Sequence, residues 1–231
     1  LARVMVDYNA IENVPGFVTG LKCHEELVRY LSADGLAGLN ASLPGDKEKF
    51  DAAVAALRDA GMVETSPVVV GRIYAALAYP AQLPAVFDAF LGIFEKRLAA
   101  KRAAAGASDG GEIEAFEFFR APAVLSALTP EQKNKLVGPL AVFLRMDAER
   151  YDTQGLSFDE LDRLERRLDG AESILAEIVG AGKGGKIRDE IGNTGHAARA
   201  NVRVEASKWV GSKDTKGALN EAPYNVPAGA P

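Results

Sequence analysis

The segment from residue 157 to residue 179 limits the possible folds more than any other part of the chain. Ser157 and Glu160 form a capping box, in which each side chain satisfies a backbone amide at the start of a helix. Apolar residues then follow at alternating spacings of three and four, which is typical of a helix with one buried face. These residues are Leu161, Leu164, Leu168, Ala171, Leu175 and Ile178. With only about two and a half heptads, the pattern predicts a long amphipathic helix packed antiparallel on a neighbour.

The opposite face of this helix is charged, and we expect it to be solvated. Its residues are Asp162, Arg163, Glu165, Arg166 and Arg167. Other helices are predicted by a capping box at Thr129 and Gln132, by an Asp46 cap, and by helix-starting prolines at positions 67 and 84. The only β-branched run, at residues 65–71, suits a helix start equally well. The sequence therefore predicts an all-α protein, an orthogonal or antiparallel bundle of about seven to nine helices with an extended C-terminal tail.

Composition shifts divide the chain into four parts. Residues 1–105 form an N-terminal helical half, and the glycine-rich residues 106–111 form a flexible break. Residues 112–210 form a C-terminal half that contains the long amphipathic helix, and residues 211–231 form the extended tail.

The composition excludes several classes of protein. The 231 residues are 48% hydrophobic, which is enough for a substantial core. The net charge of −5 does not favour nucleic-acid binding, because such binding depends on positive charge that neutralises phosphates. A single cysteine, Cys23, excludes an intramolecular disulfide framework, which favours an intracellular or organellar location over secretion. The chain starts with Leu1 rather than Met, and a processed N-terminus would agree with an organellar location.

Residues 68–94 are the least charged stretch and contain only Arg72 and Asp88. Pro80 and Pro84 interrupt it, and its uncharged middle is shorter than the roughly 18 residues that span a bilayer. The pattern favours a buried helical hairpin, with peripheral membrane contact as the alternative.

The stretch GAGKGGKI, residues 180–187, has the glycine and lysine spacing of a phosphate-binding loop. Ile187 stands where such a loop needs a Ser or Thr to bind Mg²⁺. A phosphate-binding loop also follows a buried strand, whereas these residues follow an amphipathic helix. We therefore expect no nucleotide site here, but a glycine that ends a helix and a flexible joint.

No catalytic, cofactor or metal site is predicted. Cys23 and His24 are adjacent, an arrangement that does not let their side chains face each other on a helix, and the only other histidine is His196. Two histidines and one cysteine are too few ligands for a structural zinc site. The acidic turn around Gly155 would place Arg150 and Leu161 where a calcium loop needs carboxylates.

The tail is rich in Gly, Pro and polar residues, with few apolar side chains to bury. Tyr224 lies between two prolines that restrict the chain, so it can serve as an aromatic anchor for a partner. We predict partner binding through Tyr224, Val226 and Leu219, together with Trp209.

Three functions are compatible with these features. The leading prediction is a non-catalytic helical subunit of a multiprotein assembly, whose tail docks on neighbouring protein subunits. The alternative is an all-α enzyme or small-molecule-binding protein, with a pocket between the halves near the aromatic residues of 87–94 and 116–119. The third is a viral capsid or nucleocapsid protein that uses a basic strip of Lys183, Lys186, Arg188, Arg199, Arg203 and Lys208.

Overall fold

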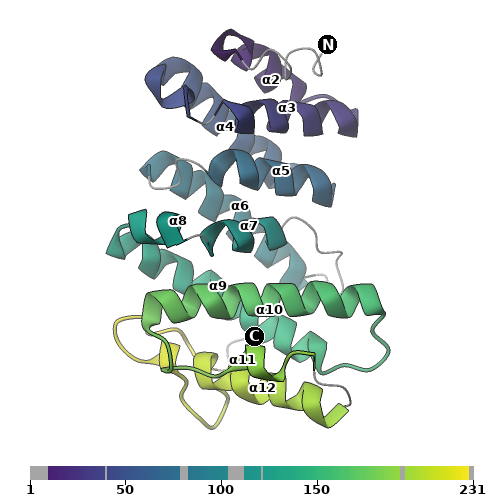
Figure 1. The fold of residues 1–231 in the computed structure, drawn as a ribbon, viewed down its shortest axis with the longest axis vertical. Helices are drawn as coiled ribbons and strands as arrows, with labels where there is room; N and C mark the ends of the chain where they lie inside the picture. The colour runs from purple at the N-terminus through teal and green to yellow at the C-terminus, as the bar shows by residue number, and fades with distance from the viewer. Residues whose placement is uncertain are drawn as a thin grey trace. The chain divides into compact units, whose positions relative to one another are not determined.

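The computed structural model describes residues 10–39, 41–78, 83–103, 112–120, 122–192 and 196–228. Throughout these ranges the protein is all-α, with eleven α-helices, three short 3-10 helices and no β-strand (Figure 1). The chain divides into two compact units, Leu1–Phe118 and Phe119–Pro231. The flexible break predicted at 106–111 lies outside the described residues.

Unit 1 is built from pairs of helices. It contains α2 (Val14–Gly20), α3 (Glu26–Gly38), α4 (Lys47–Val63), α5 (Pro67–Ala78), α6 (Pro84–Ala103) and most of α7 (Glu112–Phe119), with the 3-10 helices η1 (Ile11–Asn13) and η2 (Leu43–Gly45). Helices two apart in the chain pack side by side, α3 on α5 and α4 on α6, while α4 also contacts α5 (Figure 1). The α3/α5 pair and the α4/α6 pair thus form two layers of the unit.

Aromatic side chains fill the core of unit 1. Tyr74 of α5 lies 4.9 Å from Phe90 of α6, measured between ring centroids, and Phe94 lies 5.7 Å edge-on from Phe116 of α7. All four side chains are buried. The stretch 68–94 contributes most of α5 and the start of α6. Among its described residues, the large apolar side chains are buried, apart from Val68 and Leu83, as the helical-hairpin prediction requires. Among the described residues, no helix combines the length and apolar composition needed to span a bilayer.

Unit 2 is organised around the long helix at residues 130–151. It contains α8 (Pro122–Ala127), α9 (Pro130–Tyr151), α10 (Phe158–Val179), the four-residue α11 (Ile187–Glu190), α12 (His196–Val210) and the 3-10 helix η3 (Ala218–Asn220). α9 packs against both α10 and α12. Both predicted capping boxes are present, at the starts of α9 and α10. The buried face of α10 contains Leu164, Leu168 and Leu175, as its spacing predicts.

One charged residue of α10, Arg167, departs from the predicted pattern, and two apolar residues of that pattern, Leu161 and Ile178, are only half-buried. Arg167 is not solvated, because 2% of its surface is exposed and its guanidinium binds Asp147 of α9. The Arg167 Nε lies 2.7 Å from Asp147 Oδ2, and its Nη2 lies 3.1 Å from Oδ1. The bidentate geometry satisfies both charged groups inside the α9/α10 interface.

The structure does not confirm a free, extended tail for residues 211–228. Leu219 of η3 is fully buried, and the Asn220 side chain donates to the carbonyl oxygens of Val210 and Val226, at 3.1 and 2.7 Å. The Tyr224 hydroxyl donates to the Ile178 carbonyl of α10. A few polar contacts around one buried leucine therefore hold a segment whose composition alone predicts disorder.

We expect Leu219→Ala to lower the free energy of unfolding of unit 2 by about 2–3 kcal/mol, since the cavity adds to the lost burial. Trp209, the only tryptophan, is buried in the same unit, so its fluorescence reports this unfolding. Lys216→Ala, at an exposed position of the same segment, is the matched control. An unchanged denaturation midpoint in Leu219→Ala would show that the segment is detached in solution.

Candidate functional site

The glycine-rich stretch 180–187 is a structural joint between α10 and α11. Gly180 ends α10 with φ +114°, a backbone conformation that favours glycine. The segment before it is helical, as predicted, and α11 after it has only four residues.

Two carboxylates of the protein itself accept hydrogen bonds from the backbone amides at the end of this joint. The amides of Ile187 and Arg188 donate to the two oxygens of Glu172, at 2.7 and 2.9 Å. The Lys186 amide donates to Glu205 Oε2 at 2.8 Å. In a phosphate-binding loop such amides point at the ligand, whereas here they are satisfied within unit 2.

Trp209 packs directly on the joint. Its indole Nε1 donates to the Gly185 carbonyl at 3.1 Å and to Glu172 Oε1 at 3.3 Å. A Cβ atom added at Gly184 would lie 2.0 Å from the Trp209 ring. Gly184 and Gly185, whose added Cβ would meet the Glu205 carbonyl oxygen, are therefore required by close packing against α12.

The four residues predicted to bind partners are placed in two environments. Trp209 and Leu219 are buried in unit 2, with 1% and 0% of their surface exposed. Tyr224 and Val226 are half-buried on the segment that follows η3. Only the latter two present surface that a partner could contact without local unfolding.

Several residues behind the other two functional predictions make contacts within their own units. Three members of the basic strip form ion pairs inside unit 2: Arg188 with Asp169, Arg203 with Asp152, and Lys208 with Glu205. Of the aromatic residues expected near a pocket, Phe90 stacks on Phe94 and Phe94 meets Phe116 edge-on, all within unit 1. Among the described residues, no group of three or more His, Cys, Asp or Glu side chains is arranged to hold a metal ion.

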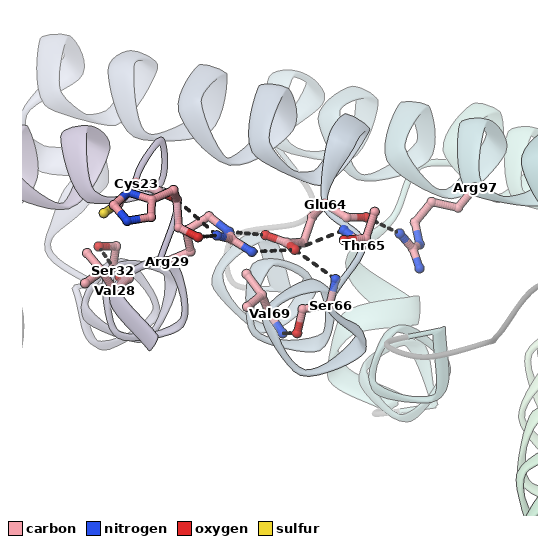
Figure 2. Close-up of polar contacts among 10 residues, drawn as sticks. Cys23, Val28, Arg29, Ser32, Glu64, Thr65, Ser66, Val69 and Arg97 are labelled. Atoms are coloured by element: carbon pink, nitrogen blue, oxygen red, sulfur yellow. Dashed lines mark hydrogen bonds and ion pairs between the residues drawn. The ribbon is translucent and has the colours of Figure 1, made fainter. Parts of the chain in front are cut away.

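A polar network that the sequence did not predict ties the helices of unit 1 together (Figure 2). The Arg29 guanidinium of α3 binds Glu64, with Nε 2.6 Å from Oε2 and Nη2 3.1 Å from Oε1. Glu64 ends α4, and its carboxylate also accepts the amides of Thr65 and Ser66 at 2.9 and 2.8 Å. Arg97 of α6 donates to the Glu64 carbonyl at 3.0 Å.

Cys23 and His24 belong to the edge of this network. They lie in the turn between α2 and α3, where Cys23 is half-buried and His24 is exposed. Their carbonyl oxygens accept hydrogen bonds from Arg29 Nη1, at 3.1 and 2.7 Å. The network therefore fixes the N-terminal end of α3 against the turn that begins α5.

Glu64 is ionised in this environment. Burial raises the pKa of its carboxyl, but the hydrogen bonds from Arg29, Ser66 and Thr65 outweigh burial, and the net pKa lies below its ordinary value. The stabilisation from this charge is therefore fully present above the pKa of the unfolded chain, and it is lost as the pH falls through the lower pKa of the folded protein.

We expect Glu64→Gln to destabilise unit 1 by about 1–3 kcal/mol at neutral pH, because Arg29 loses a charged partner. The difference from wild type should shrink as the pH falls from about 6 towards about 3, where the native carboxyl is protonated as well. Urea unfolding followed by circular dichroism over this range measures it, with exposed Glu95→Gln as the control. A difference that does not change with pH would contradict an ionised Glu64.

Beside this network, α3 and α5 share a surface on which Leu27 and Val68 are exposed, while Tyr30, Asp34 and Arg72 are half-buried. On α3, Leu27, Tyr30 and Asp34 are spaced by three and four and share one face. On α5, Val68 and Arg72 share the facing side. Arg72 pairs with Asp34, and its guanidinium carbon lies 5.8 Å from the centroid of the Tyr30 ring. We call these five residues the α3/α5 surface.

Leu27 and Val68, the two apolar residues of this surface, both lie near the N-terminal ends of their helices. Arg29 contacts the start of α5 and Asp34 contacts its second turn, so α3 and α5 run in the same direction. Leu27 lies about one helical turn before Tyr30 in α3, and Val68 lies about one turn before Arg72 in α5. Leu27 is 67% exposed and Val68 is 60% exposed. Val63, at the end of α4 beside Glu64, is 74% exposed.

Comparison with known proteins finds no family model, no curated protein and no solved structure that this chain matches. A proposal for the function therefore rests on the geometry of the chain itself.

Proposed function

We propose that this chain is a non-catalytic helical subunit of a protein assembly, and that it binds a partner protein through the α3/α5 surface. The observation that carries the proposal is the exposure of Leu27 and Val68 on adjoining faces of two helices. Burying either side chain in an interface would contribute up to about 1.5–3 kcal/mol. Two exposed apolar side chains on helices that pack on each other are surface that an interface would bury.

The rigidity of the surface supports the same proposal. The Arg29–Glu64 pair fixes the N-terminal ends of α3 and α5, and the Arg72–Asp34 pair fixes their next turns. A partner that binds there does not have to order the surface first, so less of the binding energy is lost as entropy.

The proposal moves the contact away from the C-terminal tail. Trp209 and Leu219 form part of the core of unit 2, so a partner would have to unfold the segment 211–228 to reach them. Tyr224 and Val226 stay available as a secondary contact. Peripheral membrane contact through residues 68–94 has less support, because the large apolar side chains that the structure describes there, apart from Val68 and Leu83, are buried in unit 1.

Site-specific photo-crosslinking tests the proposal. A benzophenone amino acid at position 27 should give one discrete protein adduct in an extract of the native source. The same amino acid at position 158, where Phe158 is exposed on α10, serves as the control. Adduct formation at 27 should disappear when Val68→Ser is added to the same chain. A smear of adducts at both positions, or no adduct at position 27, would reject an interaction role for this surface.

A further inference from the structure

The charges of the chain are divided unevenly between the two units. Residues 1–118 contain eleven Lys or Arg against sixteen Asp or Glu, and residues 119–231 contain sixteen of each. The whole net charge of −5 therefore belongs to unit 1, which carries the α3/α5 surface. A partner with positive charge would be attracted to this unit over distances of about a Debye length.

Near the surface, the basic groups of α3 and α5 already have acidic partners. Arg29 binds Glu64 and Arg72 binds Asp34, so these two positive charges are compensated. Glu25 and Glu26 are exposed directly before Leu27. Glu25 contacts His24, which carries a charge only when protonated. One exposed lysine, Lys22, precedes them, and the local balance stays acidic.

From this apolar and acidic arrangement we infer that the α3/α5 surface binds a basic amphipathic helix of a partner protein. The inference rests on the proposed function. The apolar face of such a helix covers Leu27 and Val68, and Lys or Arg residues at its edge lie against Glu25 and Glu26. A helix suits the site because α3 and α5 run in the same direction, and a layer of two helices is ordinarily covered by a further helix. Binding of this kind uses apolar anchors at helical spacing.

Peptide binding to the full chain tests the partner's chemistry. The probe is a fluorescein-labelled peptide of about four helical turns, with leucines on one face and lysines on the other. A second peptide replaces every lysine by glutamate. Fluorescence anisotropy at low and at moderate salt gives the dissociation constants, and circular dichroism checks that each protein variant is folded.

Three variants separate the contributions. Leu27→Ser with Val68→Ser should weaken binding of the lysine peptide by about tenfold or more, since both anchors are lost. Glu25→Gln with Glu26→Gln should weaken it by about threefold and reduce its salt dependence. Phe158→Ser with Val204→Ser removes two exposed apolar residues of unit 2 and should leave binding unchanged.

Two results would overturn the inference. One is no binding of the lysine peptide, or equal binding to wild type and to all three variants. The other is preferred binding of the glutamate peptide with loss in the Leu27→Ser, Val68→Ser variant, which would keep the surface as an interaction site and reverse the partner's charge. Failure of the crosslinking experiment rejects the interaction role itself, so the two failures are distinct.

Discussion

Replacing Arg167 by methionine should lower the free energy of unfolding of unit 2 by about 3–5 kcal/mol, the largest effect of any single side-chain loss discussed above. Asp147 is 1% exposed, and it would lose its bidentate partner inside the α9/α10 interface. Removal of one member of a buried ion pair is costly because the other member is left without compensation.

The double variant Arg167→Met, Asp147→Asn provides the control. It removes both charges, so it should recover a large part of the lost stability, and the two changes should be strongly non-additive. Urea unfolding followed by Trp209 fluorescence measures all the variants. A small effect in Arg167→Met, or additive effects in the cycle, would show that the pair is not buried in solution.

Gly185→Ala should destabilise unit 2 by about 3–5 kcal/mol, more than steric overpacking alone, because it also breaks hydrogen bonds. The added Cβ would lie 2.0 Å from the Glu205 carbonyl oxygen, so the joint must separate from α12. That separation removes the bond from Trp209 to the Gly185 carbonyl and the bond from the Lys186 amide to Glu205.

Gly138→Ala is the matched control, since a Cβ at Gly138 of α9 meets no atom within 4 Å. Alanine there should be neutral or stabilise the helix by up to about 1 kcal/mol. Trp209 fluorescence in urea again gives the comparison. Equal stability of Gly185→Ala and wild type would mean that the glycine-rich stretch is free of α12, and the phosphate-loop hypothesis would have to be reconsidered.

The helices were predictable because their signals are local. The Asp46, Thr129 and Ser157 caps each bond to an amide three residues later, so the motif and its partner are visible together in the sequence. The leucine spacing of α10 likewise identifies the face that is buried against its neighbours. The predicted seven to nine helices correspond to the longer helices of the described residues, and two helices of six residues or fewer, α8 and α11, bring the total there to eleven.

The errors arose where a residue's partner is distant in the chain. In the sequence, Arg167 belongs to a charged helix face. Its buried partner Asp147 is brought to it only when α9 packs against α10. The composition of segment 211–228 predicts disorder, because it does not show that Leu219 is buried in the core. Arg29 and Glu64 are 35 residues apart, and no spacing rule connects them. The α3/α5 surface was missed for the same reason.

If the α3/α5 surface holds this chain in a protein assembly, quantitative co-purification from the native source should depend on that surface. Tagged wild type and the Leu27→Ser, Val68→Ser variant are expressed in parallel, and circular dichroism confirms that both are folded. We expect a stoichiometric partner with wild type, and its recovery should drop by about tenfold with the variant. Equal recovery of every partner with both proteins would contradict it.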